Sequence, residues 1–416
     1  MKYLAGLLGL LLAATNVPGQ TSLPVDAWQP QRLQLVVDGQ TAFATSLYDR
    51  LRMGQGNLFF SPYSIDTALM MVYAGAGGKT AAEMASVLHL RNSMGPDELH
   101  RTLGGLVGRL QQVDKDAAYQ LHVANALWAQ SGVHWMPAYV QMLRRDYLAD
   151  TFASDFAQPE AARRSINDWI AQQTNLKITD LLPPGSVSPA TRLVLTDAVY
   201  FKADWAAPFA ASATHEGDFH IDANSTASVP MMNQIGSFAY MEDQQVQALQ
   251  MPYSGGDWAM LLILPKTVDG LGAVEAKLGP VDLTRIIGAL TDQSVRVSLP
   301  KFGLSQNFSL STVLKGMGMT RAFDPRQADF SGMDGERDLC LSDVLHKAYV
   351  AVDEQGTEAA AATGSVMVAT VMIRPQRVFN ADHPFMFFLR DLRSGVVLFA
   401  GRLSQPAQKP PNPPSR

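Results

Sequence analysis

Residues 346–370 read HKAYVAVDEQGTEAAAATGSVMVAT, and they are the most informative stretch of the 416-residue chain. The stretch begins with Ala348 to Val352, a short apolar run that predicts a β-strand. It then continues through small, nearly uncharged residues from Glu354 to Thr370. The four alanines at 359–362 have high helix propensity, so a short helix or a flexible connector is one interpretation of this stretch.

A period of two along the same stretch favours another interpretation, a segment able to enter a β-sheet. One face of such a strand is uncharged, and the other carries Glu358. The first face consists of Thr357, Ala359, Ala361, Thr363, Ser365 and Met367, and the second of Glu358, Ala360, Ala362, Gly364, Val366 and Val368. Because no side chain on the first face is charged and few are bulky, this segment can lie exposed as a loop and later enter a sheet interior.

The composition indicates a folded protein with a large core and excludes several classes of function. Apolar residues make up 47% of the chain and charged residues 17%. The single cysteine, Cys340, can form neither an intrachain disulfide nor a cysteine-ligated metal cluster. A net charge of -5 provides no basic field for nucleic acid or anionic membranes. We therefore expect no nucleic-acid or membrane partner.

The N-terminus has the pattern of a signal peptide covering residues 1–19. Lys2 precedes an uninterrupted apolar run from Leu4 to Ala14, and small residues and Pro18 follow. We therefore expect a secreted protein, extracellular or periplasmic according to the host. The alternative is an N-terminal helix packed in the core. No later segment reaches about eighteen apolar residues, so no membrane span is expected.

The remaining chain reads as one folded unit from residue 30 to residue 406, followed by a proline-rich tail, 407–416, that we expect to be disordered. The first half is mostly helical in pattern, and strands dominate the second half, which predicts an α+β fold. Helical stripes comprise Ile166, Trp169 and Ile170, and Leu310, Val313, Leu314 and Met317; predicted strands include 193–201, 260–264, 295–299, 348–352 and 396–400.

Motifs for enzyme chemistry fail on their spacing. AGAGGKT at 74–80 lacks the first glycine of a phosphate loop and follows a helical pattern, so a helix end and turn are predicted instead. His215 and Glu216 do not continue into a zinc-binding His-Glu-x-x-His motif, and no Gly-x-Ser-x-Gly elbow occurs. The sequence therefore predicts no metal site, no cofactor and no enzymatic activity.

Six segments together resemble the serpin family, in the family's order and over nearly the whole length from about Thr41 to Pro406. They are NLFFSPYSIDTAL (57–69), RLVLTDAVYFKADW (192–205), LPKF (299–302), ADFSGM (328–333), HKAYVAVDEQGTEAAAATG (346–364) and FNADHPFMFFLRD (379–391), and LFAGRLSQP (398–406) closes the domain. The resemblance implies a fold with three β-sheets, eight or nine helices and an exposed reactive-centre loop. It also implies an inhibitor that traps a protease covalently by inserting the cleaved loop into the central sheet.

The resemblance assigns a hinge to the start of this loop. The hinge residues are Glu354, Gly356, Thr357, Ala359, Ala360, Ala361 and Ala362, and none of those that would point inward is charged or bulky. This pattern is typical of an inhibitory member, whereas an interrupted hinge would indicate a non-inhibitory binding protein or chaperone.

Counting from Glu354 and back from Phe379 places the cleaved bond between Thr370 and Val371. Val368 and Ala369 would then contribute to recognition, and the small residues favour an elastase-like serine protease, with a cysteine protease as the alternative. The register could shift to Ala369 or Met372. Arg374 would suit a trypsin-like protease, but it lies four residues beyond the expected position and precedes Pro375.

The resemblance also implies a polar cluster that controls opening of the sheet, formed by Ser61, Ser64 and His346, and places Trp205 where the loop enters. Asp197 stands where the family usually has Asn. A pair between Asp197 and His346 would make sheet opening depend on pH, whereas a neutral, hydrogen-bonded Asp197 would not. A second departure is Ala203, in place of the more usual Gly. The helix expected around 96–110 has only Arg101 and Arg109 as basic residues, so no heparin-type site is expected. We expect a monomer.

Overall fold

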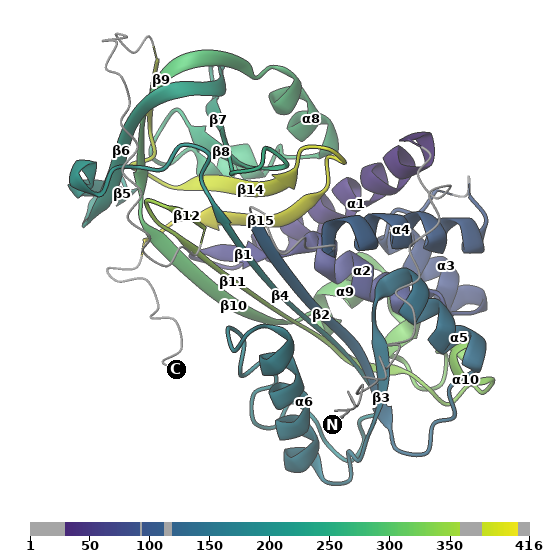
Figure 1. The fold of residues 1–416 in the computed structure, drawn as a ribbon. Coiled ribbons are helices and arrows are strands. Elements are labelled where there is room, and N and C mark those ends of the chain that lie inside the picture. Colours follow the sequence, from purple (N-terminus) through teal and green to yellow (C-terminus); the bar gives the residue numbers. More distant parts are fainter. Residues whose placement is uncertain (1–29, 92–93, 112–118, 358–376, 407–416) are drawn as a thin grey trace, which may run out of the picture.

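Two β-sheets and a layer of helices build the molecule; most of the helices are gathered at one side of the sheets, whereas α6 and α8 lie apart from that group (Figure 1). The computed structural model describes residues 30–91, 94–111, 119–357 and 377–406. The helices are α1 (Pro30–Leu51), α2 (Pro62–Tyr73), α3 (Gly78–Val87), α4 (Pro96–Gln111), α5 (Pro137–Met142), α6 (Pro159–Gln173), α7 (Leu271–Glu275), α8 (Pro280–Gly288), α9 (Ser311–Met317) and α10 (Ser331–Asp334).

The strands alternate with these helices only in part, because long antiparallel runs occupy the middle of the chain. They are β1 (Leu58–Phe60), β2 (Tyr119–Gln130), β3 (Asp150–Ser154), β4 (Leu193–Asp204), β5 (His215–Asp222), β6 (Ser225–Glu242), β7 (Val246–Pro252), β8 (Trp258–Pro265), β9 (Thr291–Pro300), β10 (Phe302–Ser309), β11 (Leu341–Val352), β12 (Gly356–Thr357), β13 (Arg377–Asn380), β14 (Phe385–Asp391) and β15 (Val397–Leu403).

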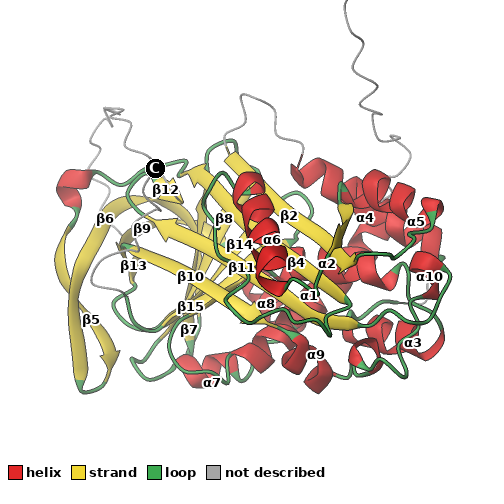
Figure 2. Ribbon diagram, turned by 90° about the horizontal axis from the view of Figure 1, so that it is seen from below, coloured by secondary structure: helices red, strands yellow, loops and turns green. Residues whose placement is uncertain are grey.

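One sheet has six strands in the order β10-β11-β12-β4-β2-β3. The other has nine, with β1-β15-β14-β8-β7-β6-β9-β13 as its path and β5 paired to β6. Helix α6 lies across the outer face of the six-stranded sheet, where Ile166 and Ile170 pack on Val194 and Ala198 (Figure 2). Both faces of that sheet are therefore covered around β4, and its strands are apolar on both sides.

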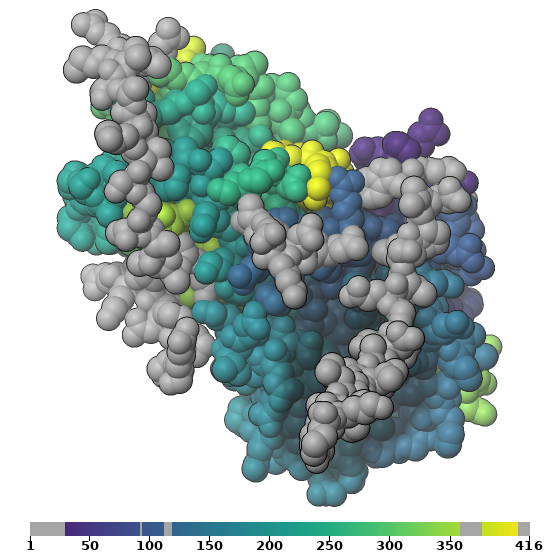
Figure 3. Space-filling model, viewed as in Figure 1, coloured from purple at the N-terminus to yellow at the C-terminus, as the bar shows by residue number. Residues whose placement is uncertain are grey.

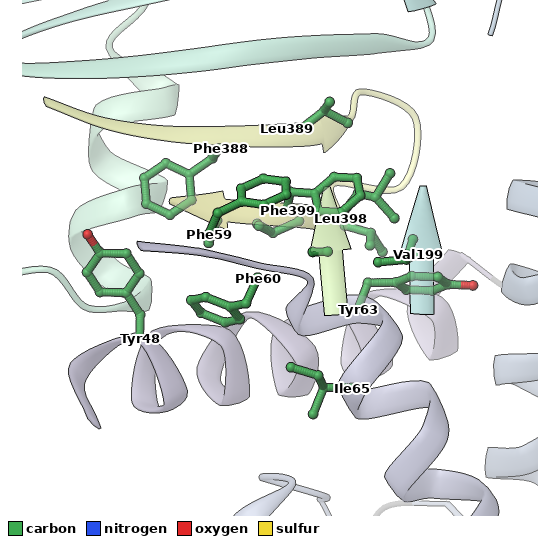
Figure 4. Close-up of a cluster of buried hydrophobic side chains, with 14 of the residues drawn as sticks. Tyr48, Phe59, Phe60, Tyr63, Ile65, Val199, Phe388, Leu389, Leu398 and Phe399 are labelled. Carbon is green, nitrogen blue, oxygen red and sulfur yellow. The ribbon is translucent and has the colours of Figure 1, made fainter. Parts of the chain in front are cut away.

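The main core lies where β1, β14 and β15 meet the first two helices. Phe59 stacks on Phe399 with ring centroids 5.0 Å apart. In Figure 4 these rings lie between strand β14, which carries Phe388, and the helices that carry Tyr48 and Ile65. Burying aromatic rings of this size provides much of the hydrophobic stabilisation. The helical layer and the sheets form one continuous body in the space-filling view (Figure 3).

Helix α2 begins where local sequence rules predict. Ser61 is its N-cap and accepts a hydrogen bond from the Ser64 backbone N–H, and Pro62 occupies the first turn, where no N–H partner is needed. This start fixes Ser61 and Ser64 at the end of α2 that faces the six-stranded sheet.

The α+β prediction is confirmed, and each predicted strand and helical stripe coincides with a strand or helix of the structure, apart from Leu310 and Val396, which lie one residue before α9 and β15. Helices dominate the first half as predicted, but β1, β2 and β3 also lie there and were not predicted; β2 and β3 belong to the six-stranded sheet and β1 to the nine-stranded one. Within the described residues there are ten α-helices, several of them a single turn or little more. The expected three sheets are hydrogen-bonded as two, because β6 pairs with β7 at one end and with β9 along its length.

No helix in the described ranges is long and apolar enough to cross a membrane. The predicted signal peptide, 1–19, and the predicted disordered tail, 407–416, lie outside the described residues.

Candidate functional site

The hinge begins as a tight turn between β11 and β12. The Asp353 side chain accepts hydrogen bonds from the backbone N–H groups of Gln355, at 2.9 Å, and Gly356, at 3.3 Å. The Asp353 N–H donates to the Gly356 carbonyl at 3.0 Å. Aspartate is favoured in such turns because its carboxylate satisfies the backbone two residues on. The turn reverses the chain and directs residues 356–357 back along β11.

Strand β12 enters the six-stranded sheet as a wedge between β11 and β4. Thr357 lies opposite Val352 of β11 and opposite Ala203 of β4, antiparallel to both. Beyond this point β11 and β4 pair directly with each other, in parallel, from Tyr349 and Tyr200 down to their beginnings. The loop that follows Thr357 therefore starts where the C-terminal ends of β11 and β4 are separated by β12. The rest of these two strands are paired directly with each other.

Gly356 occupies a position where no side chain fits. A Cβ atom there would lie 2.1 Å from the Ala203 carbonyl oxygen and 2.7 Å from the Asp204 Cα. Both are backbone atoms of β4 and cannot swing aside. Glycine therefore permits the close approach of β12 to β4.

Trp205 and Tyr253 hold the hinge in place. The Trp205 indole N–H donates to the Asp353 carbonyl at 3.0 Å, and its backbone N–H donates to the Gln355 carbonyl at 2.7 Å. Its ring stacks on Tyr253 at 4.4 Å between centroids. The Tyr253 hydroxyl in turn lies 2.6 Å from the Thr357 hydroxyl, which is 1% exposed. Thr357 thus already points into the core, as the period-two pattern predicts for its face.

Glu354 is anchored by side chains from two other segments. Its carboxylate accepts hydrogen bonds from Lys301, at 2.7 Å, and from the Thr214 hydroxyl, at 2.8 Å. Its carbonyl accepts from the Phe209 N–H at 2.8 Å. Burial alone would raise the pKa of Glu354, but the hydrogen bonds, that from Lys301 first, outweigh burial and leave the pKa lowered.

The second group of predicted residues meets farther along the same pair of strands. His346 of β11 and Asp197 of β4 are register partners, and the His346 Nδ1–H donates to Asp197 Oδ2 at 2.9 Å. His346 Nε2 accepts from the Ser61 N–H at 3.0 Å, so the ring proton is on Nδ1. The Ser64 hydroxyl donates to the other oxygen of Asp197. All four residues are fully buried.

This polar cluster connects the helix α2 to the gap between β11 and β4. The Ser61 hydroxyl donates to the Leu398 carbonyl at 2.6 Å, so β15 is joined to the cluster as well. Parting β11 from β4 would break the contact between His346 and Asp197. The structure therefore brings together Ser61, Ser64, Asp197 and His346, whereas Trp205, just past the end of β4, lies with the hinge.

Several residues of the site were not identified from sequence. Lys301, Thr214 and Tyr253 lie more than fifty residues from the hinge, and no local pattern relates them to it. Lys301 belongs to the LPKF segment (299–302), one of the segments that resemble the family. That resemblance was the one signal that could have related Lys301 to the hinge. Asn125, the partner of Asp197 on β2, was hidden because β2 was not predicted.

The remaining predicted site residues lie outside the described residues. These are Ala359, Ala360, Ala361, Ala362, Val368, Ala369, Thr370 and Val371. Among the described residues no three His, Cys, Asp or Glu side chains are grouped so that they could hold a metal ion.

Comparison with known proteins agrees with this geometry. The family model for serpin (serine protease inhibitor) matches residues 38–406. An uncharacterized serpin-like protein of Thermococcus kodakarensis is 41% identical, over 89% of this chain and 86% of the relative. Leukocyte elastase inhibitor of Homo sapiens is 36% identical, over 90% of this chain and all of the relative. Together these matches support a protease inhibitor, with a target protease as partner, and not an enzyme.

Solved structures give the same fold. Serpin48 of the insect Tenebrio molitor superposes with a TM-score of 0.79 and 30% identity, covering 91% of this chain and 99% of the other. Human thyroxine-binding globulin in complex with thyroxine superposes with a TM-score of 0.82 and 30% identity, covering 90% of this chain and 100% of the other. Structural similarity therefore extends to a protein named for hormone binding, and the hinge must decide between the two kinds of function.

Proposed function

Because the chain belongs to the serpin family of serine protease inhibitors, we propose that it is a secreted suicide inhibitor of an elastase-like serine protease. The observation that carries this proposal is the position of β12, which begins a strand between β11 and β4. Continuing that strand after cleavage of the loop would complete the insertion that traps the protease.

The register of β12 supports the proposed length of the inserted strand. Eleven positions separate Val352 from the start of β11 at Leu341, and ten separate Ala203 from the start of β4 at Leu193. A strand continuing from Thr357 in the same register would therefore reach the ends of both neighbours at residues 368 and 367. Cleavage after Thr370 would leave the attached protease just beyond the lower edge of the sheet.

The residue types along this path support the proposal too. Residues that share the inward face with buried Thr357 are Ala359, Ala361, Thr363, Ser365 and Met367. None of them carries a charge into the core, so burial of this face has no ionic desolvation cost. New backbone hydrogen bonds, at roughly 0.5 to 1.5 kcal/mol each, would favour the inserted state.

The proposed reaction begins as ordinary proteolysis. The protease serine Oγ attacks the Thr370 carbonyl carbon, its proton passes to the protease's own base, and the bond to Val371 breaks. The proton is then delivered to the Val371 amine, which leaves, while Thr370 remains esterified to the serine. Insertion of the loop then carries the ester to the far end of the sheet and halts hydrolysis by water.

The elastase preference rests on two observations. Thr370 and its neighbours Val368 and Ala369 are small or β-branched, which suits a shallow specificity pocket. Relatives of 36% and 38% identity, from Homo sapiens and Bos taurus, carry the name leukocyte elastase inhibitor.

A complex-formation assay tests the proposal. The protein is mixed with elastase, subtilisin, chymotrypsin and trypsin, and we expect an SDS-resistant band with elastase. The C-terminal peptide that is released should begin at Val371, which mass spectrometry can verify. Cleavage without such a band for every protease would instead indicate a non-inhibitory member of the family.

Thr357→Arg provides a matched test of insertion, with Thr357→Val as its control. Arginine would place a charge at a site that is 1% exposed beside Tyr253, so the variant should be cleaved as a substrate. Valine fits the same space and should retain inhibition. Inhibition by both variants would contradict the insertion mechanism.

Secretion is proposed from the N-terminal pattern at 1–19. Expression of the full-length gene should yield mature protein outside the cytoplasm with Gln20 near its N-terminus. Recovery of a cytoplasmic protein that retains residues 2–19 would refute secretion without affecting the inhibitory mechanism.

A further inference from the structure

A small cavity lies among the helices α1, α2 and α4 and the chain that follows α3, on the side of the molecule where these helices gather (Figure 1). Its volume is about 20 Å³, which is room for a single molecule of the size of water. Much of its wall is aliphatic, and Leu88, Leu99 and Leu103 are buried there. Two polar side chains, Gln40 of α1 and Asp66 of α2, also line it, and we name it the Asp66 cavity.

The two polar side chains leave one acceptor without a partner. Gln40 Nε2 donates to Asp66 Oδ2 at 2.9 Å, and Gln40 Oε1 is buried with no hydrogen-bond partner among the described residues. Gln40 is 7% exposed and Asp66 is 2% exposed. A buried polar atom without a hydrogen bond is destabilising, so the Gln40 oxygen lacks a donor that a bound molecule can supply.

The backbone provides further acceptors on the side of α3. Helix α3 ends at Val87, and His89 follows it in the left-handed region, with a φ of 53°. A Cβ atom on Gly39 would lie 3.2 Å from the His89 carbonyl oxygen and 3.8 Å from that of Leu88, so both oxygens lie against α1 beside a residue that lines the cavity. The C-terminal end of a helix carries a partial negative charge, which favours a cation nearby.

The other donors that line the cavity are engaged elsewhere. His89 Nε2 lies 2.9 Å from the Ser46 hydroxyl, and the Arg91 guanidinium lies 3.9 Å from the Asp38 carboxylate. Within the described ranges no basic side chain forms an ion pair with Asp66, and burial raises the pKa of Asp66 to about 7. An ionised Asp66 therefore has no counter-charge of its own.

We propose that the Asp66 cavity binds one ammonium ion when Asp66 is ionised. Ammonium is close to water in size, carries a positive charge and only donates hydrogen bonds, which the Asp66 carboxylate, Gln40 Oε1 and the neighbouring backbone carbonyls would accept. A calcium or magnesium ion needs about six or more oxygen ligands, which is more than this cavity offers. A water molecule fits the same space but leaves the carboxylate without a counter-charge.

Binding of ammonium is linked to folding and to pH. The cavity exists only when α1, α2 and α4 are packed together, so ammonium binds the native state alone and raises the Tm. Ammonium competes with the proton for Asp66, whose pKa is about 7 in the native state. The ion therefore stabilises the protein above about pH 7 and has no effect at pH 5, where Asp66 is protonated.

The titratable and charged groups that face Asp66 are Tyr63 of α2, Tyr147 of the turn 143–147, and His89 and Arg91, which line the cavity with it. Burial raises the pKa of both tyrosines and lowers that of His89, so these three groups are neutral at pH 8. Arg91 carries its charge at both pH values. His89 is the other group of this set that titrates near neutral pH, and a variant of His89 separates its effect from that of Asp66.

The experiment measures the Tm of the full-length protein at pH 8 and pH 5 in ammonium chloride, potassium chloride or tetramethylammonium chloride at equal ionic strength. At pH 8 we expect ammonium to raise the Tm by about 2 to 3 °C, relative to tetramethylammonium, at a concentration roughly ten times the dissociation constant. Potassium should give less than about half of this rise. At pH 5 the three salts should give the same Tm.

Asp66→Asn is the principal variant, because asparagine keeps the shape of the side chain and removes its charge. It should abolish the difference between ammonium and tetramethylammonium at pH 8. The matched controls are His89→Asn, which removes the other titrating group, and Asp38→Asn, which removes a carboxylate of α1 that is 40% exposed. Both controls should keep the full rise in Tm.

The outcomes decide between ammonium and the other occupants. Equal effects of ammonium and tetramethylammonium at pH 8 would refute the site, since a water molecule would then account for the cavity. An equal rise with potassium would overturn the assignment to ammonium, and a rise that persists in Asp66→Asn would place the ion elsewhere.

An NMR measurement on the unmodified protein decides the question if Asp66→Asn does not fold. With nitrogen-15-labelled ammonium at pH 8, we expect a bound signal whose protons are protected from exchange with water. Absence of that signal would refute the proposal. Neither result affects the proposed inhibition, because none of β4, β11 and β12 lines the cavity.

Discussion

Replacing Asp197 by Asn tests how the polar cluster controls entry of the loop. In the structure the Asp197 carboxylate accepts from His346 across the boundary of β4 and β11, at 2.9 Å, with neither side chain exposed. Insertion of a strand would double the spacing of β4 and β11 from about 4.8 Å, and this contact would break. Asn keeps an acceptor for the His346 N–H but removes the charge.

The expected magnitude follows from the two kinds of hydrogen bond. Hydrogen bonds to charged groups contribute about 1.5 to 3 kcal/mol, and neutral ones about 0.5 to 1.5 kcal/mol. Lowering the barrier to opening by about 1 to 1.5 kcal/mol would accelerate insertion by roughly fivefold to thirteenfold. The assay is the rate at which a labelled peptide of residues 358–369 enters the sheet, followed on native gels.

Asp180→Asn is the matched control, because Asp180 pairs at the surface with Lys347, the neighbour of His346. Surface pairs contribute little, so this variant should take up peptide within twofold of the unmodified rate. A rate for Asp197→Asn that is unchanged or slower would refute the argument that this contact resists opening.

Three further predictions concern the hinge and the helical layer. Gly356→Ala should expel β12, because its Cβ would meet the Ala203 carbonyl at 2.1 Å, and protease cleavage of the hinge should accelerate at least tenfold; an unchanged rate would contradict the close approach. Lys301→Glu should weaken the hold on Glu354 and lower the Tm, and the exchange Lys301→Glu with Glu354→Lys should restore most of it, as scanning calorimetry can measure. Burial raises the pKa of Asp66 from 3.8 to about 7. Between about pH 4 and pH 7 the Asp66 carboxyl is therefore protonated in the native state and ionised in the unfolded state. The free energy of unfolding should therefore fall as the pH rises from about 4 to about 7, by up to about 4 kcal/mol. In Asp66→Asn the Tm should no longer differ between pH 5 and pH 8 for this reason. A difference in Tm as large as that of the unmodified protein would refute the assignment to Asp66.

Much of the fold was predictable because the alternation of residues and the turn signals were local. The ends of β4 and β8 were predicted to within three residues, because both are apolar runs bounded by polar residues or Gly, whereas only the last five residues of β11, 348–352, were predicted. β2 was not, because eight of its twelve residues are buried and it lacks a clear alternation.

The site was predictable in part for the same reason. The period of two in the sequence predicts which face of the hinge points inward, and Thr357, which belongs to that face, is buried in the structure. How far the hinge has entered the sheet does not follow, because that depends on Tyr253, Trp205 and the Ala203 backbone, which are distant in sequence.

The most direct test of the insertion mechanism is the Tm before and after a single cut in residues 358–376 by a protease that the protein does not inhibit. Insertion would add about ten residues to the sheet, and each would contribute about 1 kcal/mol through its backbone hydrogen bonds. Because about 1 kcal/mol of stability raises the Tm by about 2 °C, the Tm of the cut protein should rise by about 20 °C or more. A Tm that stays the same or falls after the cut would contradict the claim that the loop gains stability by joining the sheet.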